Sequence, residues 1–301
     1  MRYGLPTSLC HNGIPVTGDC AMGRWMPMLW VGLALLMIWP GVAMLVNYPV
    51  AAARLAQGAQ LDCETAWRCA QELSRPVIPF PAQLWSGLVN LSWPLNSSTL
   101  PYNALYTAAE TLAGLGLALL VGAVTGTVLA FSRAFERMVL PWLVASQNVP
   151  IIALAPVIAV LLGQFGVEGL LPKAIVSAYI AFFPLSIGIA RGLQRVHPLQ
   201  LDLMRTYASR SWQVFLWLRI PAALPMIFTS LKLSVTMALV GAMIAEISIV
   251  SFAGLGPMIL GRLQFSDTTG LWAIMIYAAG IGILMVQGIQ LLERLVLRGR
   301  P

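Results

Sequence analysis

The sequence predicts an all-α, polytopic membrane protein with about six transmembrane helices. The chain of 301 residues is 58% hydrophobic and only 10% charged, and its mean hydropathy is +0.80. A helix needs about 20 apolar residues to cross the hydrocarbon core, and long runs without acidic or basic residues recur along this chain. A soluble enzyme of this length is much more polar, so that class is nearly excluded.

Six runs are assigned as membrane spans, because Asp, Glu, Lys and Arg are costly in lipid. The runs are 25–53, 111–132, 138–167, 174–190, 220–245 (broken only by Lys232) and 268–292. We place the first crossing at 25–46 and an external loop at 47–104. Pro150, Pro156 and Pro184 lie inside spans, where we expect them to bend the helices.

Two further apolar stretches are interpreted as connections. The stretch 76–109 carries five prolines among several Asn and Ser residues, and such proline density predicts a loop. The stretch Ile247–Gly261 is interrupted by Gly254-Leu255-Gly256-Pro257, which predicts an external, re-entrant connection between the last two spans.

The basic residues predict the orientation in the membrane. With a cytoplasmic N-terminus, the inner loops collect twelve of the eighteen basic residues, the outer loops five, including Lys173, and the last is Lys232 inside a span. This positive-inside bias places both termini in the cytoplasm. The net charge of +7 therefore reports topology rather than a nucleic-acid partner.

The ends of the first span carry two open questions. Residues 1–24 are expected to be a cytoplasmic tail, and Met22 is an alternative start that would leave 1–21 either as a tail or as a wrongly chosen start. Cys63 and Cys69 fall in the expected external loop, where an oxidising compartment allows a disulfide. A disulfide and two free thiols are equally compatible with the sequence.

Residue types for catalysis are scarce. The chain has only two histidines, His11 and His197, so a catalytic triad or a metal cluster has little to build on. Neither Lys173 nor Lys232 follows a glycine, which excludes a phosphate-binding Walker loop. We therefore expect no catalytic residue, no metal site and no cofactor in this chain.

A stripe of small residues marks a packing face in the second span. Its members, Gly114, Ala118, Gly122 and Gly126, recur every four residues, so another helix can approach this face closely. The partner is expected to be a helix of the same chain, with a subunit interface as the alternative.

The longest inner connection, 191–220, has amphipathic character. After Pro198, which suits a first helical turn, Leu201, Met204 and Ala208 share one face of a predicted short helix. The helix is expected to break at 209–211, and a second amphipathic segment covers 212–219. Such a helix fits a lipid surface or a groove on a cytoplasmic partner.

These residues resemble the inner-membrane permeases of binding-protein-dependent ABC importers, especially the sulfonate, taurine, nitrate and pyrimidine-precursor group. Their cytoplasmic signature is Glu-Ala-Ala, three residues, Gly, nine residues, then Ile-x-Leu-Pro. Counting back from Pro221 places Ala208 at the Gly position and Asp202-Leu203-Met204 at Glu-Ala-Ala. The likeness covers 105–298 and includes Asn148-Val149-Pro150, Phe182-Phe183-Pro184, Ala245-Glu246 and Gly254-Leu255-Gly256.

The resemblance implies a type I importer permease domain at 105–298, with a cytoplasmic coupling loop at 191–220. It implies a bacterial inner-membrane location, a second permease copy or paralogue, a periplasmic solute-binding protein, and cytoplasmic ATP-binding subunits that hold ATP and Mg. The transported solute would be small and anionic, such as a sulfonate, taurine or nitrate. The contact with the ATP-binding subunits would use Asp202, Leu203, Met204, Arg205, Ala208, Arg210, Trp212 and Pro221.

This sequence departs from the family pattern at two places. Ala208 replaces the turn glycine, and Asp202-Leu203-Met204 matches Glu-Ala-Ala only in chemical character. Either weakened coupling or pairing with a different permease would follow from these departures.

Charged residues in the spans suggest a substrate pathway. Lys232 either extends its amine to the membrane surface or attracts an anionic solute, and Glu246 is either part of an outer gate or an exposed helix-end carboxylate. The alternative function is an ion-coupled carrier or channel, which commonly has acidic residues deep in the bilayer. Glu110, Glu246 and Glu293 are predicted near span ends, which argues against a proton relay.

Overall fold

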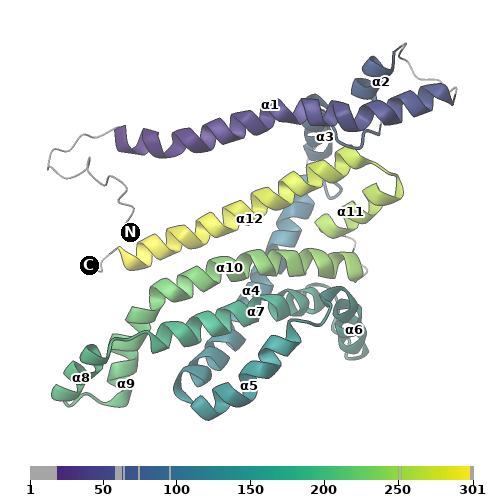
Figure 1. Cartoon of the computed structure of the whole chain (residues 1–301). Helices are drawn as coiled ribbons and strands as arrows, with labels where there is room; N and C mark the ends of the chain where they lie inside the picture. The colour runs from purple at the N-terminus through teal and green to yellow at the C-terminus, as the bar shows by residue number, and fades with distance from the viewer. Residues whose placement is uncertain are drawn as a thin grey trace. The chain divides into compact units, whose positions relative to one another are not determined.

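The computed structural model describes residues 19–57, 63, 65–73, 75–94, 96–249, 251 and 253–298, and every regular element in these ranges is a helix (Figure 1). The chain divides into two compact units, Met1–Ala82 and Gln83–Pro301. The all-α prediction is confirmed. Of the predicted tail 1–24, residues 1–18 are outside the described residues, and residues 19–24 belong to the first helix.

Unit 1 is built on one long helix, α1 (Asp19–Ala56), and a short one, α2 (Ala66–Glu72). The expected end of the first crossing at 46 is wrong, because α1 continues for ten further residues to Ala56. Asn47 is fully buried; its side-chain oxygen accepts hydrogen bonds from the Val77 and Ile78 amides at 3.0 and 3.3 Å. This asparagine therefore fixes the returning chain to α1, and the external loop does not begin there.

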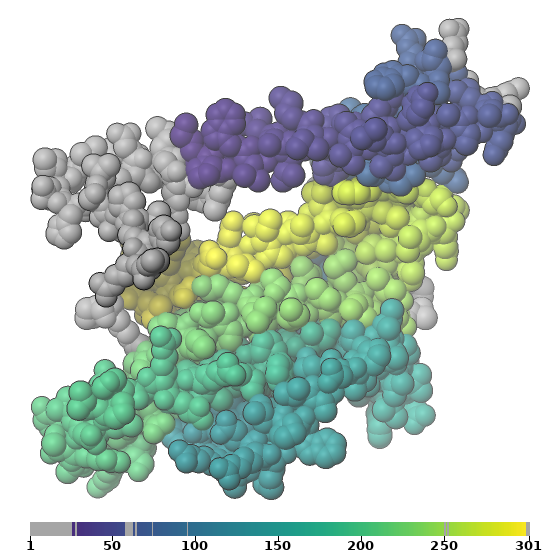
Figure 2. Space-filling view, viewed as in Figure 1, coloured from purple at the N-terminus to yellow at the C-terminus, as the bar shows by residue number. Residues whose placement is uncertain are grey.

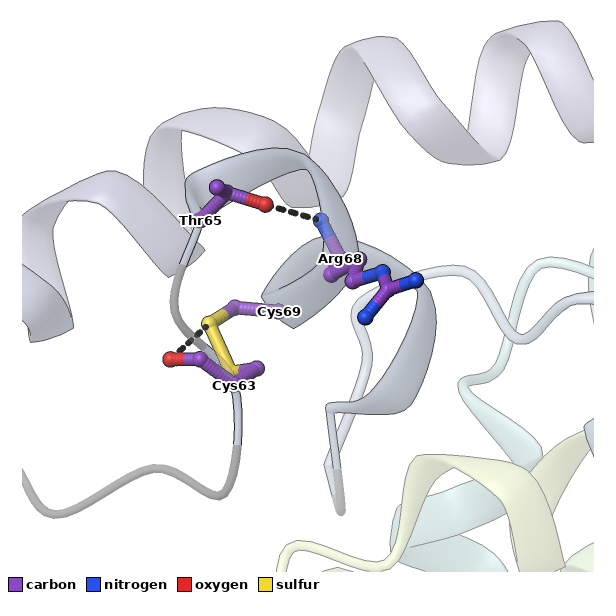
Figure 3. Close-up of a disulfide and its surroundings, with 4 residues drawn as sticks. All are labelled: Cys63, Thr65, Arg68 and Cys69. Carbon is purple, nitrogen blue, oxygen red and sulfur yellow. Dashed lines mark hydrogen bonds between the residues drawn. A yellow bond between two sulfur atoms is a disulfide. The ribbon is translucent and has the colours of Figure 1, made fainter.

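A disulfide joins Cys63 to Cys69, with 5.3 Å between their Cα atoms (Figure 3). Thr65 caps α2 by accepting a hydrogen bond from the Arg68 amide at 3.4 Å. Cys69 is buried in a small apolar cluster with Met44 of α1. The bridge thus ties α2 to the segment that precedes it, and the apolar cluster around Cys69 packs α2 against α1 in a unit whose own apolar core is small.

We expect Cys63 and Cys69 to resist labelling by a membrane-impermeant maleimide in intact, non-reduced cells, because disulfide sulfurs do not react as thiols. After mild reduction, both cysteines should label from outside. The measurement is mass spectrometry of the labelled peptides. Labelling of both without reduction would show that the bridge is absent in cells, and labelling only after membrane opening would overturn the topology.

Unit 2 contains the remaining helices. They are α3 (Pro81–Ser92), which begins just before the boundary, α4 (Leu100–Phe131), α5 (Arg133–Ser146), α6 (Ile151–Gln164), α7 (Leu170–Gln194), α8 (Pro198–Thr206), α9 (Ser211–Gln213), a π-helix η1 (Val214–Arg219), α10 (Ile220–Ser248), α11 (Leu255–Gln264) and α12 (Thr268–Leu297). Within the described residues of both units, five helices are long and apolar enough to cross a membrane, or six spans if α5 and α6 count as one.

The third predicted span, 138–167, is not one straight helix. It consists of α5 and α6, which meet at an angle of 100°. Pro150 precedes α6 directly, and the residue before a proline avoids helical conformation. The bend expected from Pro150 is therefore present, whereas Pro156 and Pro184 lie inside α6 and α7.

The prediction of a loop over 76–109 is wrong in two places. Pro81 begins α3, and Pro101 lies in the first turn of α4. A first-turn proline loses no helical hydrogen bond, because its amide would have no partner there in any case. These prolines mark where helices start, and only the residues between the helices form loops.

The core of unit 2 is the packing of α7 against both α4 and α10. The stripe predicted from Gly114 to Gly126 faces α7: a Cβ added at Gly126 would lie 2.6 Å from the Ser186 carbonyl oxygen. Ala118 and Leu185 belong to the same buried cluster. Of the two partners considered for this stripe, the helix of the same chain is the one the structure shows.

Candidate functional site

The segment 191–220 forms a projection at one end of unit 2. Helices α8 and α9 lie at the lower left in Figure 1 and appear as a green projection in Figure 2. His197 caps α8, since its Nδ1 accepts a hydrogen bond from the Leu199 amide at 3.3 Å. Pro198 occupies the first helical position, so the helix start expected from the sequence is confirmed.

The turn after α8 is tightly closed. The Ala208 amide donates to the Arg205 carbonyl at 2.9 Å, and the Ser209 amide donates to the Met204 carbonyl at 3.1 Å. This pair of bonds is a Schellman motif, which needs a left-handed residue. Ala208 supplies it, with φ of 51°, at the position where the resemblance expects glycine.

Replacing Ala208 with Gly should stabilise the fold by up to about 1 kcal/mol, because glycine adopts the left-handed conformation without the Cβ clash. Thermal unfolding of the purified protein in detergent measures the effect. Ala208→Val should destabilise the fold, because a β-branched residue tolerates this conformation least; equal stability of all three forms would show that the conformation of this turn does not limit stability.

The exposed apolar side of α8 differs from the predicted one. Leu199, Leu203 and Tyr207 are 71, 55 and 74% exposed, and their spacing of four residues makes one ridge along the helix. We call these three residues the α8 ridge. Leu201 and Met204, which were predicted on the docking face, are less exposed than these three residues, and α8 is in contact with η1.

The charged residues predicted to orient the contact lie beside the α8 ridge. Asp202 and Arg205 form an ion pair of 3.0 Å with both side chains largely exposed. The backbone amide of Arg210 donates to the Gln213 side chain at 2.8 Å. Arg210 itself is exposed at the start of α9. Trp212 is 54% exposed on the same projection.

The projection is continuous with a membrane span. The helical path runs without a break from Ser211 through the π-helix and Pro221 to Ser248. Arg219 anchors the junction, since its guanidinium lies 4.8 Å from the centre of the Phe131 ring and donates to the Leu193 carbonyl at 3.2 Å. Helix α9 of the projection and α10 thus form one continuous helical path, which Arg219 holds against α4 and α7.

A second polar cluster lies at the other end of α10, and most of its members were not predicted from the sequence as parts of a site. Glu246 is 1% exposed, so the alternative of an exposed helix-end carboxylate is wrong. Its Oε1 accepts a hydrogen bond from the Thr107 hydroxyl at 2.6 Å, and its Oε2 accepts one from the Gly256 amide at 2.7 Å. Glu246 thereby joins α10 to α4 and to the start of α11.

Lys173 and Glu110 complete this cluster. Lys173, expected in an outer loop, is buried in α7 and lies 2.7 Å from Glu110. Glu110 is fully buried in α4. The predicted spans 111–132 and 174–190 begin directly after Glu110 and Lys173, because each charge was treated by itself and the ion pair between them is not visible in the sequence. One signal was available: Asn103, Thr107 and Glu110 recur at helical spacing in an otherwise apolar segment.

Lys232 has a partner that neither sequence alternative anticipated. Its amine lies 2.6 Å from the Glu293 carboxylate, and both side chains are mostly buried. The pair connects α10 to α12 and offsets the positive charge that was expected to attract an anionic solute. Among the described residues, no group of three His, Cys, Asp or Glu side chains could hold a metal ion.

A bundle of apolar spans that carries an exposed amphipathic helix at one end is the architecture of a polytopic membrane protein. The family described as "Binding-protein-dependent transport system inner membrane component" matches residues 114–298, and the chain belongs to this family. It is the permease subunit of an ATP-driven, binding-protein-dependent importer of the inner membrane.

Relatives named as transport permeases agree with this assignment. The formylaminopyrimidine transport permease protein ThiX of Halalkalibacterium halodurans is 30% identical over 224 residues, which cover 74% of this chain and 86% of ThiX. The putative aliphatic sulfonates transport permease protein SsuC of Bacillus subtilis is 32% identical over 198 residues, covering 65% and 68%.

A solved structure supports the fold. A chain of the MetNI methionine ABC transporter, in an inward-facing conformation, matches with a TM-score of 0.52 at 16% identity, covering 66% of this chain and 95% of that chain. The predicted type I importer permease fold is confirmed by this match.

Proposed function

We propose that the chain pairs with a second permease subunit and docks two cytoplasmic ATP-binding subunits through the α8 ridge. The observation that carries this proposal is the exposed apolar ridge on a projection that continues into the span α10. ATP and Mg would bind to the partner subunits, so this chain itself performs no hydrolysis. The second permease subunit is another copy or a paralogue.

The charges of the projection support a protein groove as its binding site. Asp202 and Arg205 form an exposed ion pair on the same helix as the α8 ridge, and paired charges of this kind orient a protein contact. In the proposed orientation, this projection and both termini are cytoplasmic, in line with the positive-inside bias.

The solute is proposed to be small and anionic, delivered from the periplasm by a solute-binding protein. Relatives named for aliphatic sulfonates and for bicarbonate support this class. A formylaminopyrimidine is the second candidate, because the relative named for its transport is 30% identical over 86% of its length.

The energy source of uptake tests the proposed function. Cells that express the complex with its binding protein should accumulate radiolabelled ethanesulfonate or formylaminopyrimidine when a protonophore collapses the proton gradient, provided that ATP is maintained. Uptake should stop when ATP is depleted. The opposite pattern would support an ion-coupled carrier and overturn the proposal.

A further inference from the structure

Side chains from other helices, which belong to the buried cluster around Glu246, cap the N-terminus of α11. The N-cap residue of this ten-residue helix is Gly254, which has no side chain to cap it. The Gly254 amide donates to Asn103 at 2.8 Å, the Leu255 amide to the Thr107 hydroxyl at 2.9 Å, and the Gly256 amide to Glu246. The position of α11 therefore depends on the positions of α4 and α10.

The connection before α11 is held from a third helix. Lys173 of α7 donates a hydrogen bond to the Ser251 hydroxyl at 2.6 Å, and this hydroxyl donates to the Ala253 carbonyl at 2.7 Å. Lys173 also pairs with Glu110 of α4. Thus α4, α7, α10 and the connection to α11 meet in one set of polar contacts.

Gly254 and Gly256 pack so closely against Glu246 that neither position has room for a side chain. A Cβ at Gly254 would collide with the Glu246 carboxylate, and a Cβ at Gly256 would lie 2.5 Å from the Glu246 Cβ. Gly254 also has φ of 116°, which L side chains rarely adopt. The chain reaches Glu246 closely enough for these hydrogen bonds only because both positions lack side chains.

Stability alone does not account for these charges. A buried ion pair is often no more stabilising than apolar residues of similar volume, and charged residues inside membrane spans are generally functional. The second oxygen of Glu110 is buried and has no hydrogen-bond partner, which costs free energy. A cavity of about 650 Å³ lies against the cluster and is lined in part by Tyr106, Val160, Lys173 and Ser251.

We propose that Glu246 and Thr107, together with the Lys173–Glu110 pair, form a latch that holds the start of α11, Gly254 to Gly256, against α4 and α10 and releases it during each transport cycle. The proposal rests on the function given above and adds the residues that hold the outer gate. Because α10 runs unbroken from the α8–α9 projection to Glu246, movement imposed by the ATP-binding subunits separates Glu246 from Thr107. Glu246 and Lys173 are then positioning residues of transport.

A cysteine placed below the latch reports its opening. Thr111 lies one turn further into α4, is fully buried, and uses its hydroxyl only for the Thr107 carbonyl. Thr111→Cys is made in the complete complex with Cys10 and Cys20 replaced by Ala, and intact cells are treated with a membrane-impermeant maleimide. The Cys63–Cys69 disulfide stays in place, because it does not react with the reagent.

Breaking the latch should raise the labelling rate of this cysteine at least about tenfold. Glu246→Gln removes the charge at the start of α11, and Thr107→Val keeps the size of the side chain while removing both of its long-range contacts. The combined variant should label no faster than either single variant, because the two residues hold the same contact. The matched control is Lys232→Met, which breaks the other intramembrane ion pair of α10.

Each outcome decides for or against the latch. Labelling at the parent rate in both latch variants overturns it, as does equally fast labelling in Lys232→Met, which would indicate general loosening. Copurification of the ATP-binding subunit shows that each variant is folded; if Glu246→Gln fails this check, Thr107→Val alone decides. Labelling needs no transport, so absence of ATP-dependent uptake in the parent complex would refute the proposed function separately.

Discussion

Replacing Leu203 with Asp is expected to release the ATP-binding subunits and abolish uptake while leaving membrane insertion intact. Leu203 is the central residue of the α8 ridge and is 55% exposed, so the free permease accepts a carboxylate there. In the complex, the same carboxylate would be buried without a partner, which costs several kcal/mol. Since about 1.4 kcal/mol is a tenfold change, affinity should fall about 100-fold or more. Copurification of the ATP-binding subunit and ATP-dependent uptake measure the result.

Gln200→Asp is the matched control for this variant. Gln200 lies on the same helix and is exposed, but its side chain does not belong to the α8 ridge. The added charge is the same, but Gln200 is already polar and only borders the α8 ridge, three residues before Leu203, so ATPase binding should fall much less than in Leu203→Asp. Met204 is a poorer test position, because it is partly buried and a charge there would disturb α8 itself. If Leu203→Asp retains the ATP-binding subunit, the α8 ridge is not the docking surface.

Charge and hydropathy predicted the spans because burial in lipid is a property of each residue by itself. The runs at 220–245 and 268–292 correspond to α10 and α12 with small shifts at their ends. The ends of two spans were predicted wrongly because charges can act in pairs. Lys173 and Glu110 form an ion pair inside helices that were expected to end beside them. A pair separated by 63 positions along the chain leaves no mark in a local window.

In the projection, too, features set by neighbouring residues were predictable from the sequence, whereas features set by tertiary contacts were not. The start of α8 at Pro198 and its end near Ala208 follow from local turn chemistry, and both were predictable. The side that α8 presents to the outside depends on its packing against η1. Helical spacing groups Leu201 with Met204 and, equally well, Leu199 with Leu203; only the tertiary contact decides which group is exposed.

Replacing Gly114 with Leu should prevent α4 from packing against α7 and so destabilise the whole permease. A Cβ at this position would lie 2.5 Å from the Ser177 Cβ and 2.9 Å from the Ala174 carbonyl oxygen, and a backbone oxygen cannot move without shifting α7. Overpacking a close contact costs about 1–3 kcal/mol, and a branched side chain between two backbones should reach the upper end. Thermal unfolding in detergent and the yield of monodisperse protein measure the loss.

Gly116→Leu provides the control two residues further along α4. No atom lies within 4 Å of a Cβ at Gly116, and the position is exposed. The substitution replaces glycine with a strong helix former, which is worth about 0.5–1 kcal/mol, so this variant should be as stable as the parent or slightly more. The same change thus has opposite signs at two neighbouring glycines, because one lies between helices and the other does not. Equal stability of the two variants would show that the contact between α4 and α7 tolerates separation.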